Sequence, residues 1–178
     1  TWLFTMAQGN EAEVAQWSND LITILDSEAD RQVQVGHPQT SLLIRHHLRD
    51  ICPEQINNLL SLALLSIEQQ NFEPQALEEW QLTTLLLTAS STSIDLNLLF
   101  QVLPKVIEFP SQLSLDFAAA CVPHFANPEA CIDLILPIAN KTAYHFRRIP
   151  YAVAIAKFCL QIDPFHHQTL NINYYLVH

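Results

Sequence analysis

Residues 47–60, HLRDICPEQINNLL, and residues 158–171, FCLQIDPFHHQTLN, follow one pattern. Each stretch has an isoleucine two positions before a proline, Pro53 or Pro164, and a leucine six positions after it. Proline is disfavoured inside a helix because it has no N–H donor, but it is accepted in the first turn. The pattern therefore predicts that one helix ends and another begins at each of these prolines.

Helical periodicity extends outward from both prolines. Apolar residues recur at spacings of three and four, as in helices that bury one face, and no stretch predicts a strand. The pattern predicts about nine helices, at residues 11–35, 38–52, 53–67, 74–88, 94–109, 111–125, 128–146, 150–162 and 164–177. We expect Asn10 and Ser93 to be N-caps. Pro104, Pro123 and Pro137 are expected to kink or divide the helices that contain them.

Length and composition predict a single folded domain. The chain has 178 residues, of which 49% are hydrophobic and 15% are charged. A chain of this length buries about two thirds of its unfolded surface, which is enough for one core. We therefore expect one all-α domain over residues 1–178, with the hydroxyl-rich loop at 89–93 as the place where it would subdivide. The chain begins with what reads as the end of a helix, so we also expect it to be a fragment of a longer protein.

Composition and charge exclude several classes of function. Only Gly9 and Gly36 are glycines, whereas phosphate-binding loops, dinucleotide fingerprints and nucleophile elbows need two or more close together. The formal net charge of −10 disfavours nucleic acid as a partner. No apolar stretch approaches the roughly 20 residues of a membrane span. Four cysteines without a CxxC pair predict reduced thiols and a cytoplasmic protein.

The two proline junctions resemble those of the tetratricopeptide repeat. That repeat is a helical hairpin of about 34 residues, whose second helix ends shortly before a proline that starts the next unit. Before Pro164, the small residues Ala152, Ala156 and Cys159 would let two helices approach closely. Pro53 and Pro164 lie 111 residues apart, against about 102 for three ideal repeats, so the repeats between them are degenerate or carry insertions. The resemblance implies stacked antiparallel helical hairpins in an α-solenoid.

A second resemblance concerns the N-terminal half of the chain. It rests on residues 1–9 (TWLFTMAQG), 14–17 (VAQW), 21–25 (LITIL), 43–49 (LIRHHLR) and 56–60 (INNLL). These runs resemble the region between the tetratricopeptide repeats and the catalytic part of cyanobacterial SPINDLY-family proteins, relatives of the O-linked N-acetylglucosamine transferases. The resemblance implies a parent glycosyltransferase that uses a nucleotide sugar, with its catalytic domain downstream. It assigns this chain no catalytic residue, metal or cofactor, because nothing in it matches the sugar-nucleotide site.

The same family suggests where a peptide would bind. In its better-known members, asparagines on the inner face of the repeats hold the backbone of the substrate. The corresponding positions here are Ser61 and Ile172, so that ladder of asparagines is absent. The candidate peptide-binding residues are the neighbouring polar residues that should face the inner surface, namely Asn57, Gln168, Asn171 and Tyr175.

We therefore expect a non-enzymatic helical-repeat module that presents protein or peptide segments to a larger glycosyltransferase-like protein, or that binds the parent's own catalytic domain. One alternative is a stand-alone scaffold or dimerisation domain, which would form homo-oligomers through exposed solenoid ends. Another is a helical-bundle ligand carrier or enzyme that uses Cys121, His124 and Cys131, with His145 as a fourth zinc ligand, although their spacing fits no standard zinc finger.

The charged residues of the N-terminal half have two interpretations. Acidic residues recur along the first long helix, and they predict either a solvated face or a docking surface for a basic partner: Glu11, Glu13, Asp20, Asp26, Glu28 and Asp30. On the next helix Leu42, Leu43, Ile44 and Leu48 are apolar, and the polar Arg45, His46 and Arg49 are expected to lie mostly in solvent.

Overall fold

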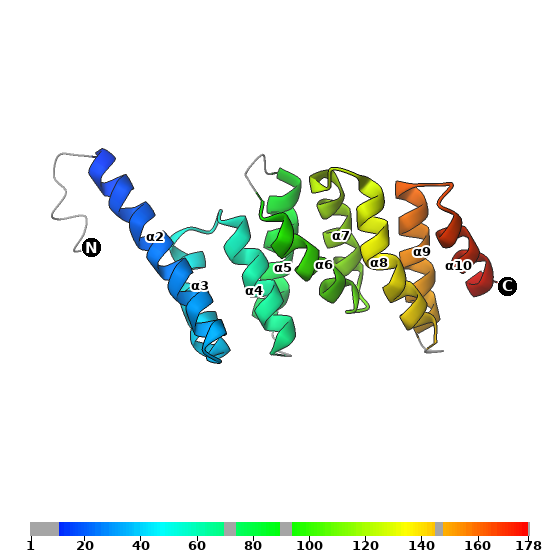
Figure 1. The fold of residues 1–178 in the computed structure, drawn as a ribbon, viewed down its shortest axis with the longest axis horizontal. Helices are drawn as coiled ribbons and strands as arrows, with labels where there is room; N and C mark the ends of the chain where they lie inside the picture. Colours follow the sequence, from blue (N-terminus) through cyan, green and yellow to red (C-terminus); the bar gives the residue numbers. More distant parts are fainter. Residues whose placement is uncertain (1–10, 70–73, 90–93, 145–147, 178) are drawn as a thin grey trace. The chain divides into compact units, whose positions relative to one another are not determined.

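The computed structural model describes residues 11–69, 74–89, 94–144 and 148–177, and within them the chain is all-α (Figure 1). The described residues form nine α-helices and one short 3-10 helix, without a strand. The α-helices are α2 (Glu11–Gln34), α3 (Pro38–Ile51), α4 (Ile56–Glu68), α5 (Pro74–Ala89), α6 (Leu96–Ile107), α7 (Gln112–Cys121), α8 (Pro128–Ala143), α9 (Ile149–Ile162) and α10 (His167–Val177). The 3-10 helix η1 is Val122–His124. The predicted fold class is confirmed.

The chain divides into two compact units, Thr1–Asn58 (unit 1) and Leu59–His178 (unit 2). Their boundary falls inside the first turns of α4, whereas the sequence pointed to residues 89–93. Helix α5 packs against α7, so the helices before and after residues 89–93 belong to the same unit. A loop rich in Ser and Thr marks a turn between helices, but only the packing of those helices decides whether a core is divided there.

Unit 1 is built on the hairpin of α2 and α3, which pack closely against each other. The hairpin turns at Gly36, whose φ of 83° lies in the left-handed region. The Gly36 N–H donates to Val33 O at 3.0 Å, and the His37 N–H donates to Gln32 O at 2.8 Å. These two bonds are the Schellman motif, which satisfies the last carbonyls of a helix and favours glycine at this position. The predicted end of the first helix before Gly36 is confirmed.

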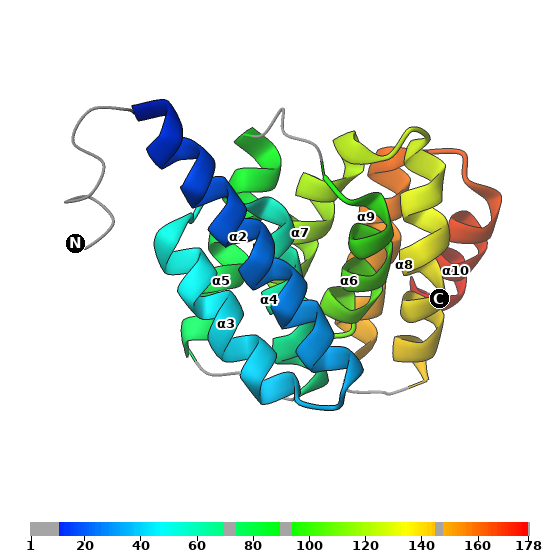
Figure 2. The same ribbon diagram turned by 60° about the vertical axis from the view of Figure 1, so that its left-hand side comes forward.

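Unit 2 is a stack of helical hairpins in which neighbouring and alternate helices pack together. Helix α6 packs against α7 and α8, α8 against α9, and α9 against α10, while α5 packs against α7. In Figure 2, α6 and α8 lie toward the viewer, in front of α9. Large side chains fill the space between the helices, among them the fully buried Trp80, Leu103, Phe117, Ile132 and Ile135.

The two matching stretches of sequence fold in the same way. Each contains a turn in which Pro53 or Pro164 is the second residue, because the Gln55 N–H donates to Cys52 O and the His166 N–H donates to Asp163 O. Proline fits this second position, where its fixed φ is already that of a turn. The predicted helix starts at the two prolines were therefore wrong, since α4 and α10 begin three residues later. The repeated junction itself is confirmed.

Other helix boundaries differ from the prediction for local reasons. Asp95 is the N-cap of α6, since its carboxylate accepts the Asn97 N–H at 2.9 Å. The two predicted caps, Ser93 and Asn10, lie outside the described residues. Helix α7 ends at Cys121 and continues as η1, because Pro123 cannot donate to an α-helical ladder. Helix α8 ends at Ala143 rather than at 146. The prolines at 104 and 137 do not divide their helices, because α6 and α8 continue past them.

Candidate functional site

The four residues predicted to bind peptide lie on two different helices. Asn57 is exposed in the first turn of α4 and belongs to unit 1. Gln168, Asn171 and Tyr175 are spaced by three and four residues, and all are exposed along one face of α10 in unit 2. The Asn171 side chain is within hydrogen-bond distance of His167 Nδ1, at 3.2 Å. The structure thus groups three of the four candidates on one helix face.

Leu170 and Tyr174, on another side of α10 from the three candidates, are exposed although their counterparts in α4 are buried. Because the two junctions match, Leu59 corresponds to Leu170 and Ala63 to Tyr174. Leu59 and Ala63 are each 1% exposed, whereas Leu170 is 43% and Tyr174 is 63% exposed. Equivalent positions of the two matching stretches are therefore buried in α4 and exposed in α10.

The cysteine and histidine side chains that the structure describes do not assemble into a metal site. Among the described residues, no three side chains of His, Cys, Asp or Glu meet in a way that could hold a metal ion. The ring Nε2 of His124 is within hydrogen-bond distance of Leu87 O, at 2.8 Å. His145, the suggested fourth ligand, lies outside the described residues.

Burial makes three of the thiols unreactive. Cys121, Cys131 and Cys159 are fully buried on α7, α8 and α9. Burial raises the pKa of the Cys131 thiol to about 12. Burial, together with the neighbouring Cys131, raises the pKa of the Cys159 thiol to about 12 and that of the Cys121 thiol well above its ordinary value. Burial and the raised pKa both disfavour the thiolate, which is the form that acts as a nucleophile.

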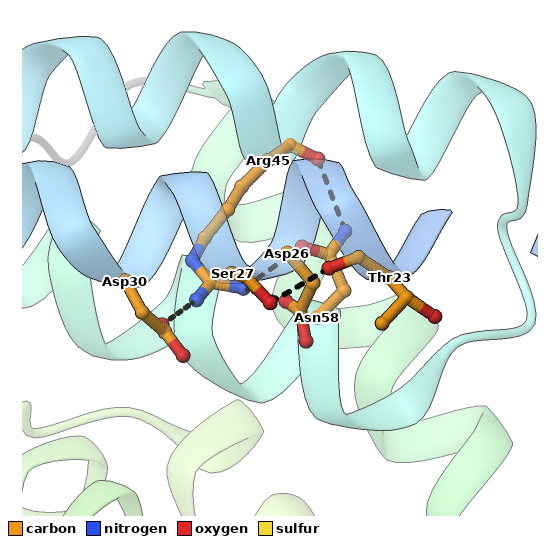
Figure 3. A network of polar contacts seen from close by, with 6 residues as sticks. All are labelled: Thr23, Asp26, Ser27, Asp30, Arg45 and Asn58. Carbon is orange, nitrogen blue, oxygen red and sulfur yellow. Dashed lines mark hydrogen bonds and ion pairs between the residues drawn. The ribbon is translucent and has the colours of Figure 1, made fainter. Parts of the chain in front are cut away.

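A buried arginine connects α2, α3 and the first turn of α4 within unit 1 (Figure 3). The Arg45 side chain on α3 is only 3% exposed, which corrects the expectation that it is solvated. Its Nη1 donates to Asp26 Oδ1 at 2.9 Å and to Asn58 Oδ1 at 3.2 Å, and its Nη2 donates to Asp30. Asn58 donates in return to the carbonyl of Arg45 at 3.0 Å. The guanidinium thus joins α3 to two carboxylates of α2 and to the start of α4.

This network also changes the interpretation of the acidic helix. Asp26 and Asp30 are one turn apart on α2, where two negative charges repel each other unless a cation lies between them. Both carboxylates pair with Arg45, and Glu28 pairs with Arg31 at 2.6 Å. Three of the predicted acidic residues therefore hold partners within the chain. Within the chain these carboxylates hold α2 to Arg45 of α3 and to Arg31 of the same helix.

A groove lies between α7 and α9 in unit 2. Its volume is about 300 Å³. The helices contribute equal sets of side chains, with the same spacing of three, four and seven residues: Gln112, Leu115, Asp116 and Ala119 from α7, and Ala154, Lys157, Phe158 and Gln161 from α9. This spacing places each set on one helix face. This groove was not predicted from the sequence, although both segments show an alanine and polar residues at the same spacing.

The groove has an apolar floor and a polar rim. Leu115, Ala154 and Phe158 are partly buried, whereas the two glutamines, Asp116 and Lys157 are exposed. The Gln112 amide donates to Asp116 Oδ1 at 2.9 Å. Lys157 forms no ion pair with any carboxylate of the described residues, unlike Lys105 and Lys141, which pair with Glu68 and Glu108. The groove can therefore hold an apolar side chain while its rim offers amides and charges of both signs.

Two further searches, for a membrane-spanning helix among the described residues and for similar proteins, found nothing. Within the described part of the chain, no helix combines the length and the apolar character that a membrane crossing requires. Comparison with protein-family models, with curated proteins and with solved structures finds no match for this chain.

Proposed function

We propose that the chain is a helical-repeat module that binds peptide segments of other proteins, and that unit 2 holds them in the groove between α7 and α9. The groove is the observation that carries this proposal. Its volume of about 300 Å³ is at the lower end of the range for ligand sites. Its apolar floor suits a buried side chain, and amides at its rim can both donate to and accept from peptide groups.

The length of the groove fits a short extended segment. Its side chains on α7 extend from Gln112 to Ala119. Seven residues of helix rise by about 10 Å, which equals about three residues of an extended chain. An occupant of three or four residues would therefore lie along the two helices, between the rim amides of Gln112 and Gln161.

The test is to fill the groove without disturbing the core. Peptides would be selected from a random displayed library on the full chain, and their affinities measured by fluorescence anisotropy. Ala119→Phe places an aromatic ring in the groove from an exposed position, and Ala126→Phe makes the same change at an exposed alanine outside it. We expect Ala119→Phe to weaken binding by about tenfold or more, since it removes the floor contacts, and Ala126→Phe to leave binding unchanged. Equal binding to both variants, or no selected peptide, would overturn the proposal.

The link to a glycosyltransferase is a separate proposal. It is supported by the resemblance of residues 1–90 to the SPINDLY family, which implies that the module presents protein segments to a sugar transferase. Its test is the gene that encodes this chain, read on both sides for a nucleotide-sugar transferase domain. The proposal stands if such a domain shares the reading frame, and a reading frame without one overturns it. Peptide binding in the groove does not depend on this outcome.

A second candidate function is self-association through α10. It is favoured by the comparison of Leu170 and Tyr174 with their buried counterparts in α4. Two copies related by a twofold axis would cover this face on both chains at once. Light scattering at high concentration would then give twice the chain mass of 20.2 kDa, and Tyr174→Lys would restore the monomer mass. A monomer mass for the unchanged chain excludes this function.

A further inference from the structure

We propose that the groove between α7 and α9 selects peptide segments in which an acidic residue stands next to an apolar one, and that Lys157 recognises the acid. This inference rests on the proposed peptide binding and adds the chemistry of the ligand. It is carried by the charges around the groove and by the order of the residues along α9.

Lys157 forms no ion pair with any of the described residues. Most cations of the chain pair with a carboxylate: Arg31, Arg45, Arg49, Lys105 and Lys141. Lys157 is exposed on the wall of the groove and has no such partner among the described residues. An exposed lysine at the rim of the groove, without an ion pair among the described residues, can pair with a carboxylate of a ligand.

The opposite wall carries the one carboxylate of the groove. Asp116 accepts the Gln112 amide at 2.9 Å and forms no ion pair with Lys157. Its negative charge repels a second acid on the α7 side, because like charges close together disfavour binding. The two walls therefore differ in sign, and a ligand carboxylate is favoured only on the α9 side. This asymmetry places the acidic side chain of the peptide on the α9 side of the groove.

The floor defines the residue beside the acid. Phe158 follows Lys157 in the sequence and is partly buried, with the small Ala154 one turn before it and Leu115 and Ala119 on the other helix. Neighbouring side chains of an extended peptide point to opposite sides. When one side chain enters the floor beside Phe158, the next one is directed to the rim, where the flexible lysine reaches it. The preferred ligand is therefore an acidic residue followed or preceded by an aliphatic one.

The experiment uses three capped hexapeptides that differ at one position, Ac-Gly-Ser-X-Leu-Ser-Gly-NH2, where X is Glu, Gln or Lys. Each is titrated into the full 15N-labelled chain to millimolar concentration, and amide shifts of Ala119, Ala154 and Phe158 report occupation of the groove. We expect the Glu peptide to bind about threefold to tenfold more tightly than the Gln peptide, and the Lys peptide to bind most weakly.

Substitution of the lysine separates its charge from the rest of the groove. Lys157→Gln should remove the difference between the Glu and Gln peptides, and Lys157→Glu should reverse the order in favour of the Lys peptide. Lys141→Gln is the matched control, since Lys141 is also an exposed lysine but pairs with Glu108 and lies on α8. This control should keep the preference for the Glu peptide.

The outcomes distinguish this inference from the proposed function. If all three peptides shift the groove amides equally and Lys157→Gln changes nothing, peptide binding stands and selection of an acid is overturned. If the Lys peptide binds the unchanged chain best, the inference is also overturned. If no peptide shifts the groove amides, the proposed function fails together with the inference.

Discussion

Replacement of Arg45 by methionine is expected to lower the free energy of unfolding of unit 1 by about 2–3 kcal/mol. Removal of one partner from a fully buried ion pair costs about 3–5 kcal/mol, because the remaining charge is left without compensation. Here the side chains of Asp26 and Asp30 are 49% and 62% exposed, so water replaces part of the lost interaction. The buried amide of Asn58 loses its bond to Nη1 and adds to the cost.

Native-state hydrogen exchange is the measurement for Arg45→Met, since it reports the stability of α2 and α3 separately. Arg31→Met is the control, because Arg31 is an exposed arginine that pairs with Glu28 on the same helix, and this change should leave amide protection unaltered. Arg45→Lys should be intermediate, since an ammonium keeps the charge but cannot form the bonds of two guanidinium nitrogens. Unchanged protection in Arg45→Met would show that the network adds nothing to the packing of the three helices.

Replacement of Trp80 by alanine is expected to lower the free energy of unfolding of unit 2 by about 3–5 kcal/mol. Trp80 on α5 is 1% exposed, and its ring packs edge-on against Phe109 with 5.7 Å between the ring centroids. Alanine would remove these contacts and leave a cavity where α5 packs against Phe109, a residue between α6 and α7. Protection of the amides in α6 to α9 is the readout.

Trp80→Phe is the matched control for the size of the ring. The Nε1 atom of Trp80 is buried and has no hydrogen-bond partner among the described residues. Phenylalanine therefore loses no hydrogen bond and keeps part of the aromatic packing, so its cost should be about 1–2 kcal/mol. A cost as large as that of alanine would mean that the indole N–H has a partner, such as a bound water.

Arg45→Met and Trp80→Ala together test whether units 1 and 2 unfold separately. If the units unfold separately, Arg45→Met lowers protection in α2 and α3 alone, and Trp80→Ala lowers it in α6 to α9 alone. An equal loss of protection throughout the chain in both variants would show that the two units form one cooperative structure.

The candidate site was less predictable than the fold. Arg45 is three residues from both Leu42 and Leu48, so helical spacing places it on the buried face of α3, and only its charge led to the expectation of solvent. Its burial depends on Asp26 and Asp30, which are distant in sequence and approach only when α2 packs on α3. The acidic pair four residues apart was a visible signal, but nothing in the sequence assigned a cation to it. The groove required the same kind of information, because α7 and α9 are separated by α8 and become its two walls only in the folded unit.

The sequence by itself determined which segments are helices, where most of them end, and that the junctions at Pro53 and Pro164 are alike. These features depend on local physics, such as the missing N–H of proline, the left-handed conformation of Gly36 and apolar residues at helical spacing. Only the tertiary structure decided the division inside α4, the burial of Arg45, and the exposure of Leu170 where Leu59 is buried. Each of these depends on which helix covers a given face, and a helix face carries the same apolar pattern whether or not a neighbour covers it.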